Sequence, residues 1–314
     1  MSLMDTATVE RFEANRDRMA SLAYRLLGSA TDAEDTVQDA FLRWQAADRA
    51  LIEVPEAWLT KVVTNLALDR LKSARAQRER AVGDWLPEPL LEGDPMLGPA
   101  DTVEQRESVT LAVLLLMERL SPVERAVYVL REAFSYTHGE VAEILDISES
   151  ASQQHLHRAR RRVADERKAG EIDRVAARRV VEAFIAAASS GSTGRLVELL
   201  TDDVSAASDG AGLSGKVQRR SGAQKVAVML RAGFKPTPAK RRIVGGSPSL
   251  HAAVVNGAPA MVAVMGDRVL GLVVLEVRGG RATDVIGTAS PERLERFTEA
   301  WRRGEHDDPL VESW

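Results

Sequence analysis

The stretch TDAEDTVQDAFLRW, residues 31–44, has the pattern of one amphipathic helix with an acidic start and an apolar far end. Thr31 and Glu34 have the spacing of a capping box, which predicts that the helix starts at Thr31. Apolar side chains recur at i, i+4 and i+7 and would form one stripe, namely Val37, Phe41 and Trp44. The side chains that flank this stripe are Asp32, Asp35, Gln38 and Asp39. On periodicity alone, the simpler interpretation is a core face beside a solvated acidic face.

Composition favours a multidomain protein without cysteine chemistry. The chain has 314 residues, 45% of them hydrophobic, and no cysteine. Its length suggests about two domains, and the lack of cysteine excludes disulfides, thiolate metal sites and cysteine nucleophiles. Residues 1–10 lack a basic start and an apolar run, and no later stretch is long and apolar enough to cross a membrane. We therefore expect a soluble, cytoplasmic protein that makes no membrane contact.

Basic residues cluster in two places, although the formal net charge of −4 makes the whole molecule a poor nonspecific binder of polyanions. The first cluster is Lys61, Arg70, Lys72, Arg75, Arg78 and Arg80. The second is Arg158, Arg160, Arg161, Arg162, Arg167 and Lys168. An acidic stretch that contains four prolines separates them. This arrangement suggests two contacts on one long nucleic acid.

The first 81 residues are predicted to form a compact helical domain. It would hold a helix that stops at Gly28, the acidic helix, and a third helix that starts at Val54-Pro55. Residues 82–101 have the prolines, glycines and acids of a linker, so we expect a flexible connection there. Helices resume near Thr102.

The segment 102–169 is predicted to contain a helix-turn-helix. Ser121-Pro122-Val123-Glu124 combines an N-cap, a proline at the first helical position and a glutamate at the third. The stretch 137–140 is a second capping box and opens a short helix. Residues 146–148 would form the turn before a last helix from Glu149 to about Lys168. The inward residues of that helix are predicted to be Ser152, Leu156, Ala159 and Val163.

Residues 170–314 have the pattern of an α+β domain. An alanine-rich helix to about Ser189 and a helix at 196–200 precede a run of strands, and Pro291–Arg303 forms a closing helix. The strands are expected at 204–208, 243–244, 250–255, 261–265, 269–278 and 282–287. Helices followed by strands indicate an α+β domain with a curled sheet.

Three motifs, in order and with matching spacing, resemble extracytoplasmic-function (ECF) RNA polymerase sigma factors. They are residues 32–44, Trp58-Leu59 with residues 65–71, and Leu120-Ser121-Pro122 with residues 155–160. Residues 85–90, WLPEPL, and the C-terminal extension resemble the group that carries a SnoaL-like domain. That group's Asp-Gly-Gly-Gly-Lys motif is interrupted here over 209–216, and its Asn-Pro-Asp-Lys-Leu motif is represented only by SPERL, residues 290–294.

The resemblance implies a multidomain fold and a function in transcription. It implies an all-α sigma region 2 (1–81), a linker (82–101), a helix-turn-helix region 4 (102–169) and a SnoaL-like cone-shaped α+β domain (170–314). Such an alternative sigma factor binds the β and β′ subunits of core RNA polymerase and directs promoter-specific initiation. The acidic helix would dock on the polymerase, with the contact candidates Asp32, Asp35 and Gln38.

The resemblance also names promoter DNA as a partner. Region 2 would melt the −10 element, where cations hold phosphates and exposed bases are stacked or pocketed. Its candidates are Asn65, Arg70, Lys72, Arg75 and Arg78. In region 4, glutamines would read adenine edges of the −35 element and arginines would contact guanine or phosphate. These candidates are Gln153, Gln154, His157, Arg158, Arg160 and Arg161.

The third domain is expected to regulate the other two by packing on the sigma domains in cis. Its regulatory candidates are Asp209, Gly210 and Lys216. No metal or cofactor is expected.

Two alternatives remain open. A helix-turn-helix regulator could bind duplex DNA without polymerase, but it would have no use for an acidic docking helix or a second basic cluster. A SnoaL-like isomerase or cyclase would need a carboxylate or histidine base in an apolar cone, with donors for a developing enolate. The available bases are Asp209, His251 and Asp284. Because a fold does not by itself establish an activity, we expect no enzyme.

Overall fold

The computed structural model describes residues 6–78, 85–98, 102–164, 174–210, 216–235 and 237–314. It divides into two compact units, and each is described by itself. The first comprises residues 1–82, 93–109 and 113–167, and the second comprises residues 83–92, 110–112 and 168–314.

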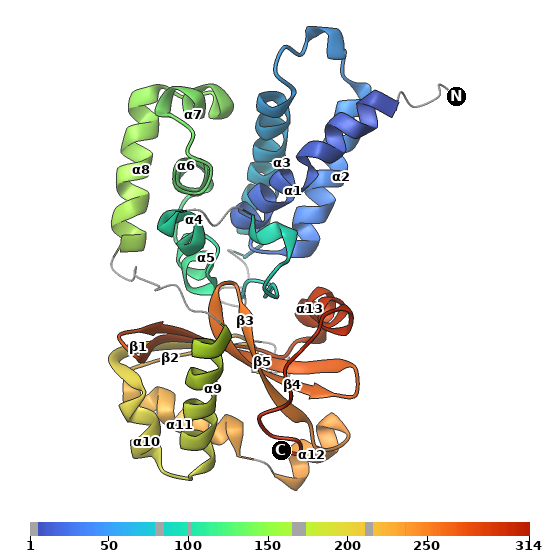
Figure 1. Ribbon diagram of the computed structural model, residues 1–314. Coiled ribbons are helices and arrows are strands. Elements are labelled where there is room, and N and C mark those ends of the chain that lie inside the picture. Colours follow the sequence, from blue (N-terminus) through green and yellow to red (C-terminus); the bar gives the residue numbers. More distant parts are fainter. Residues whose placement is uncertain (1–5, 79–84, 99–101, 165–173, 211–215, 236) are drawn as a thin grey trace. The chain divides into compact units, whose positions relative to one another are not determined.

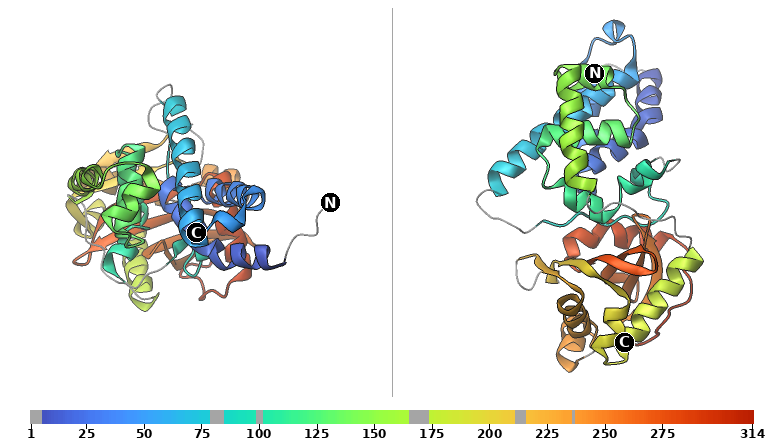
Figure 2. Two further views of the ribbon diagram at one scale, coloured as in Figure 1. Left: turned by 90° about the horizontal axis from the view of Figure 1, so that it is seen from above. Right: turned by 90° about the vertical axis from the view of Figure 1, so that its left-hand side faces the viewer.

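The first unit begins with α1 (Thr6–Leu27), α2 (Ala30–Ala46), η1 (Arg49–Leu51) and α3 (Pro55–Arg78). The three α-helices pack side by side in a bundle (Figure 2). Trp44 is buried in this bundle, where its indole N–H donates to the carbonyl oxygen of Thr8 at 3.1 Å. Val37 is also buried, which confirms the predicted core stripe for these two residues. Phe41 is half-buried, and its ring packs edge-on against Phe12.

The start of α2 differs from its prediction. Ser29 is the N-cap residue, and its side-chain oxygen accepts from the backbone N–H of Asp32 at 3.0 Å. The predicted capping box of Thr31 and Glu34 is therefore wrong by two positions, because Ser29 follows directly on the left-handed Gly28 that ends α1.

The unit continues with η2 (Pro95–Leu97), α4 (Val103–Glu107), α5 (Leu111–Met117), α6 (Pro122–Glu132), α7 (His138–Leu145) and α8 (Glu149–Ala164). Both predicted capping boxes, at Ser121 and Thr137, are present. Asp146 adopts the left-handed conformation that turns the chain from α7 into α8, and the two helices cross in Figure 1. The helix-turn-helix is therefore confirmed.

The helix-turn-helix contacts the first helices within this unit. The hydroxyl of Tyr136, just before α7, accepts from the Arg18 guanidinium at 2.8 Å and lies 3.0 Å from the hydroxyl of Thr60. The ammonium of Lys61 donates to the carbonyl oxygen of Glu143 at 2.8 Å. Side chains of α1 and α3 are thus hydrogen-bonded to the segment that holds α7.

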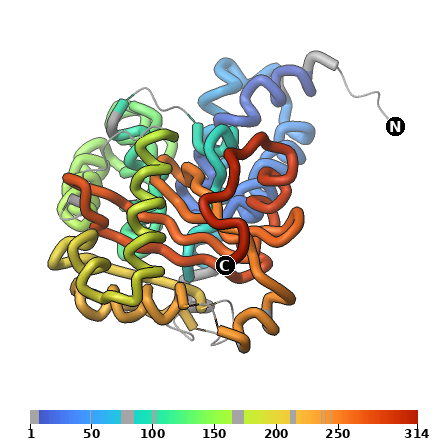
Figure 3. The backbone as a smooth tube through the Cα atoms, turned by 60° about the horizontal axis from the view of Figure 1, so that its bottom comes forward, coloured from blue at the N-terminus to red at the C-terminus, as the bar shows by residue number. Residues whose placement is uncertain are grey.

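The second unit contains α9 (Arg174–Ser189), α10 (Thr193–Glu198), α11 (Ala223–Phe234), α12 (Pro238–Val244) and α13 (Pro291–Arg303) around one sheet. The strands are β1 (Leu200–Ser208), β2 (Gln218–Ser221), β3 (Ser249–Val255), β4 (Ala258–Met265), β5 (Arg268–Arg278) and β6 (Arg281–Thr288). Their order is β2-β1-β6-β5-β4-β3, with β1 and β6 parallel and the other pairs antiparallel. The sheet curls (Figure 2), and α9 lies across its strands (Figure 3).

This unit confirms the predicted α+β class but corrects two details. Residues 243–244 end α12 instead of forming a strand, because Thr237 caps the helix and Pro238 starts it. The sequence patterns also missed β2 and α11. The helices and one face of the sheet enclose an apolar core that includes Phe184, Leu196, Phe234, Leu275 and Val285.

Residues 85–92 are an ordered part of the second unit, not the flexible spacer that their composition predicts. Leu91 forms an antiparallel bridge with Val255 at the end of β3. On either side of that bridge, Asn256 N–H donates to the Leu90 carbonyl at 3.0 Å and Glu92 N–H donates to the Val254 carbonyl at 3.1 Å. The amide oxygen of Asn256 accepts from Leu90 N–H at 2.8 Å in a buried setting.

Replacing Asn256 is expected to loosen the segment 85–92. Asn256→Gly keeps the left-handed backbone available but leaves Leu90 N–H without its acceptor, which costs about 1–3 kcal/mol. Asn256→Ala adds about 1 kcal/mol of strain, because this residue has a φ of 50°. Denaturant unfolding and chymotrypsin cleavage near Trp85 and Leu90 measure the effect. Wild-type stability and wild-type cleavage in both variants would contradict it.

Candidate nucleic-acid and polymerase interface

Helix α8 has a buried inner side and a polar, exposed outer side. Ser152, Leu156, Ala159 and Val163 are all buried, as the periodicity predicts. Four of the predicted DNA contacts, spaced along the opposite side of the helix, are exposed: Gln153, Gln154, His157 and Arg161. Amide groups and a cation on one exposed helical face have the donors and acceptors that base edges and phosphates require.

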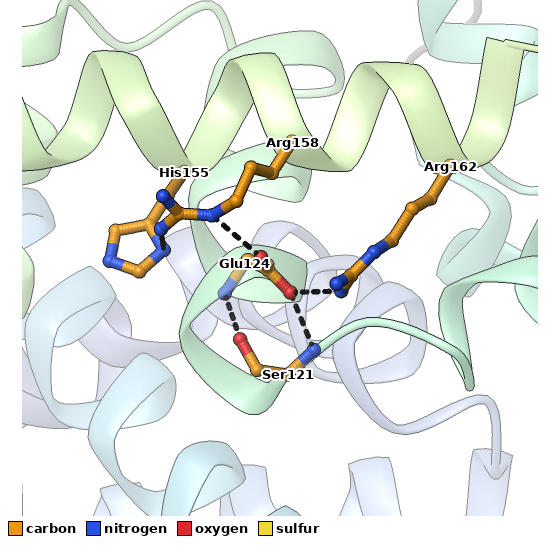
Figure 4. Close-up of polar contacts among 5 residues, drawn as sticks. All are labelled: Ser121, Glu124, His155, Arg158 and Arg162. Carbon is orange, nitrogen blue, oxygen red and sulfur yellow. Dashed lines mark hydrogen bonds and ion pairs between the residues drawn. The ribbon is translucent and has the colours of Figure 1, made fainter.

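The arginines on one flank of α8 are held by a buried carboxylate of α6. Glu124 accepts from Arg158 Nε at 3.0 Å with one oxygen and from Arg162 Nη1 at 2.7 Å with the other (Figure 4). The second oxygen also closes the capping box by accepting from Ser121 N–H at 2.9 Å. Burial alone would raise the pKa of Glu124, but the hydrogen bonds from Ser121 and Arg158, with the charge of Arg162, lower it. Glu124 thus stays ionised and fixes both guanidinium groups.

Two further contacts restrain this flank and the opposite one. Arg158 Nη2 lies 2.9 Å from His155 Nδ1, as Figure 4 shows. Partial burial and the charge of Arg158 lower the pKa of His155. On the other flank, Arg160 binds Glu132 with two nitrogens at 2.7 and 3.1 Å. Arg158 and Arg160 nevertheless keep 46% and 55% of their side chains exposed, so a phosphate can still approach them.

The structure brings together two sets of residues that the sequence assigned to different partners. Arg70 of α3 lies 3.7 Å from Asp32, 3.7 Å from Asp35 and 2.9 Å from Asp39 of α2. The carboxylates of Asp32 and Asp35 remain more than half exposed, and Gln38 is also exposed. Arg70 therefore neutralises part of the acidic face from below and orients its side chains.

The other predicted −10 contacts lie along α3. Asn65 is half-buried, and Lys72 is exposed, with its ammonium 3.7 Å from Asp69. Arg75 and Arg78 belong to the last turns of α3, and their side chains lie outside the described set.

Asp209 connects the two motifs of the C-terminal domain that differ from the family pattern, residues 209–216 and 290–294. Its buried carboxylate accepts from the backbone N–H groups of Ala289 and Ser290 at 2.9 and 3.0 Å. Arg293, from the SPERL stretch, lies 3.4 Å from the same carboxylate. Gly210 follows with a positive φ of 59°, and Lys216 is exposed. The predicted regulatory residue Asp209 thus links the end of β1 to the start of α13 by hydrogen bonds and an ion pair.

His251 and Asp284, which could act as bases if the C-terminal domain were an enzyme, each have hydrogen-bond partners elsewhere in the fold. The His251 ring lies 3.0 Å from the Ser249 hydroxyl and 3.2 Å from the Asp307 carbonyl, and burial lowers its pKa. Asp284 accepts from the Ser205 hydroxyl at 2.5 Å. These contacts occupy the groups that a catalytic base would have to keep available.

A buried carboxylate pair escaped the sequence analysis. Glu276 of β5 is paired in register with Asp284 of β6, and one of its oxygens lies 3.5 Å from Ala112 N–H. Burial, followed by the nearby charge of Asp284, raises the pKa of Glu276 to about 8. A single glutamate in the apolar strand VVLEV was the only available signal, and it does not reveal the cross-strand partner. The pair therefore retains a proton near neutral pH.

Neither a metal centre nor a membrane span is evident in the part of the chain that the structure describes. No group of three or more histidine, aspartate or glutamate side chains is arranged to hold a metal ion there. Likewise, none of the helices in those ranges has the length and apolar character needed to cross a bilayer.

Comparisons with known proteins match both helical parts and the whole fold. Family models for Sigma-70 region 2 and Sigma-70, region 4 match residues 11–77 and 110–163. The chain is 41% identical over 206 residues to "ECF RNA polymerase sigma factor SigJ" of Mycobacterium tuberculosis, which is 65% of each chain. It is 32% identical over 289 residues to "Probable ECF RNA polymerase sigma factor SigI" of the same species, 90% of this chain and 93% of that protein.

A solved structure supports the same relationship. The crystal structure of the Mycobacterium tuberculosis extracytoplasmic function sigma factor SigJ matches with a TM-score of 0.68 and 32% sequence identity. The match covers 92% of this chain and 98% of that one.

Glu276→Gln is expected to remove a pH dependence of stability. Because the folded pKa is raised, the unfolded chain loses this proton at lower pH than the folded chain does. The glutamate therefore lowers the free energy of unfolding as pH rises from its ordinary pKa to about 8. Urea unfolding at pH 5 and pH 8 should show that the advantage of Glu276→Gln grows with pH. An advantage that is equal at both pH values would contradict this assignment.

Proposed function

This chain belongs to the ECF RNA polymerase sigma factors and acts in promoter-specific transcription initiation with RNA polymerase, and from that premise we propose a role for each of its parts. Helix α2 binds the core polymerase, α3 and α8 bind the two promoter elements, and the second unit regulates both in cis. The observation that carries this proposal is the pairing of residues 90–92 with the end of β3. Through this pairing, the C-terminal domain would control the segment between the two helical parts. Because promoter DNA and RNA polymerase meet in the bacterial cytoplasm, the chain would work in that compartment.

The acidic face of α2 would dock on a basic and apolar surface of the β′ subunit. Asp32, Asp35 and Gln38 supply its exposed acceptors, and Arg70 holds the two carboxylates in position without covering them. A polymerase cation can therefore approach carboxylates whose side-chain freedom is already restricted, which reduces the entropic cost of binding. In this proposal Arg70 positions the docking face and is a weaker candidate for −10 DNA than Asn65 and Lys72.

Helix α8 would enter the major groove of the −35 element with its exposed face. Gln153 and Gln154 would read adenine edges, while His157 and Arg161 would contact the backbone. Glu124 and Glu132 orient Arg158 and Arg160 toward the flanks of the helix. Those two arginines would then approach the phosphates that line the groove.

The second unit would act as a regulatory domain without catalysis. Phe184 and Phe234 pack edge-on with ring centroids 5.5 Å apart in the core that faces the helices. Asp209 and Asp284 are committed to structural hydrogen bonds. These observations favour a domain that holds other segments of the chain over one that turns over a substrate.

Asp35→Lys should weaken binding to core polymerase by about tenfold or more, because reversal places a like charge opposite the basic docking surface. Fluorescence anisotropy of the labelled chain with core enzyme measures the affinity. Glu34→Lys, an equal charge change at an exposed position of α2, is the matched control. Loss of the exposed Asp35–Arg70 pair costs at most about 1 kcal/mol, so both variants should fold. Unchanged affinity for Asp35→Lys would remove the docking assignment.

Arg161→Ala and Arg158→Ala should separate DNA contact from helix support. Arg161→Ala is expected to weaken −35 DNA binding similarly for all sequences and to reduce the salt slope by about one, with unchanged thermal stability. Arg158→Ala also removes an ion pair with buried Glu124, so its melting temperature should fall. Electrophoretic shifts at several salt concentrations and thermal unfolding distinguish the two effects. Sequence-selective loss in Arg161→Ala would show base contact instead.

The assignment of promoter elements is tested by run-off transcription with purified core polymerase. The full chain should initiate from a promoter with both elements, and substitutions at the −35 element should reduce transcripts through α8. Binding to duplex DNA without any initiation would favour the regulator that acts without polymerase.

A further inference from the structure

Strand β3 is one of the two edge strands of the sheet, and among the described residues the chain covers its open side only at the two ends. At one end, Leu250 N–H donates to the Val311 carbonyl at 2.8 Å, and Leu310 N–H donates to the Leu250 carbonyl at 2.7 Å. At the other end, the segment 90–92 pairs with residues 254–256. The C-terminal tail and the segment after Trp85 thus act as two short neighbouring strands with a gap between them.

The gap exposes the backbone of Ala252. In an antiparallel strand, successive residues direct their N–H and C=O groups to alternate sides. Leu250, Val254 and Asn256 direct theirs away from β4, as their contacts with the tail and the segment 90–92 demonstrate. Ala252 follows the same alternation, and no other backbone group pairs with it among the described residues. One donor and one acceptor therefore lie side by side without a partner.

This open pair faces a cavity of about 150 Å³. Its walls come from three separate segments of the second unit: Leu91 and Glu92, Arg174, and residues 304–307, with β3 as the floor. Backbone groups at a sheet edge next to an empty volume of this size form a site with both shape and polarity.

Three of the four charged side chains that line the cavity are paired, and the fourth, Glu305, is exposed to solvent. Arg174 Nε lies 2.7 Å from Glu92, and Asp307 lies 3.6 Å from the Arg178 guanidinium. Leu91, Ala253 and Val254 supply apolar surface. The remaining His306 ring is fixed by stacking on Trp301 at a centroid distance of 3.6 Å. The cavity thus suits an uncharged molecule that has one polar edge and an apolar body.

We propose that this cavity binds a small neutral lactam or cyclic amide, whose adjacent N–H and C=O pair with the carbonyl and N–H of Ala252. The ligand is a small molecule and not a peptide strand, because among the described residues the flanking strands leave open only the backbone of Ala252 and the N–H of Val254, which is too short an edge for a strand. A lactam satisfies both backbone groups from one edge of its ring, whereas a cyclic ketone has the acceptor but no N–H donor.

Because of where the cavity lies, a bound ligand would affect the segment between the two helical parts, and this inference rests on the proposed function. Leu91 and Glu92 form one wall, so an occupied cavity would favour the paired state of the segment 85–92. The ligand would thereby bias the connection between the two promoter-binding parts by population shift.

The probe for this site is δ-valerolactam, with N-methyl-2-piperidone and cyclohexanone as matched rings that lack the amide donor. Binding to the full chain is followed by TROSY NMR of backbone amides, without polymerase or DNA. For a ligand this small, the dissociation constant should be on the order of millimolar. The expected result is a saturable shift of the Ala252 amide, with roughly tenfold weaker binding of both control rings. Equal binding of all three rings, or shifts elsewhere only, would overturn the proposal.

A variant provides a second measurement. Ala252→Pro removes the outward donor at an edge position that tolerates proline, so the folded variant should lose the lactam response roughly tenfold. Wild-type lactam affinity in that folded variant would contradict the assignment. If the variant does not fold, the comparison of the three rings decides. Because the readout is binding alone, failure here is distinguishable from failure of the proposed regulation in transcription assays.

Discussion

An edge strand needs partners for its backbone, and in this protein the chain supplies them from two distant segments. Unpaired N–H and C=O groups on an exposed edge favour association with other strands. Here β3 is covered by the C-terminal tail and by the residues just after Trp85. The second cover has a functional consequence, since the covering residues join the two helical parts of a sigma factor. A requirement of sheet chemistry thus ties the connection between the promoter-binding parts to the C-terminal domain.

Charge neutralisation within the chain organises both helical interfaces. Arg70 lies beneath the carboxylates of α2, and Glu124 lies beneath the guanidinium groups of α8. In each case the buried or half-buried partner fixes the side chains and leaves their outer atoms exposed. The two surfaces carry opposite charges. These charges suit the proposed partners, a basic polymerase surface for α2 and DNA phosphates for α8. Their internal counter-charges reduce repulsion and restrict side-chain motion before any partner arrives.

In the second unit, buried carboxylates connect separate elements of the fold. Asp209 links the end of β1 to α13 through backbone N–H groups and Arg293. Asp284 and Glu276 form a buried pair in which burial favours the protonated state of Glu276. Asp209 and Asp284, two of the available bases in the sequence, therefore both have structural hydrogen-bond partners. At the edge of the sheet, the backbone of Ala252 beside the cavity remains open among the described residues.

The sequence by itself determined the local elements and the family. Capping residues at Ser121 and Thr137, the inward face of α8 and the helix 291–303 all follow from spacings of three and four residues. Such spacings suffice because helical contacts are local. Two local signals were assigned wrongly, namely the cap at Ser29 and the Thr237-Pro238 start of the helix that ends at residues 243–244. Tertiary structure alone decided the pairing of residues 90–92 with β3 and the partners of Arg70, Arg158 and Glu276. Those features depend on which distant segments meet, and nothing in the spacing of neighbouring residues encodes that meeting.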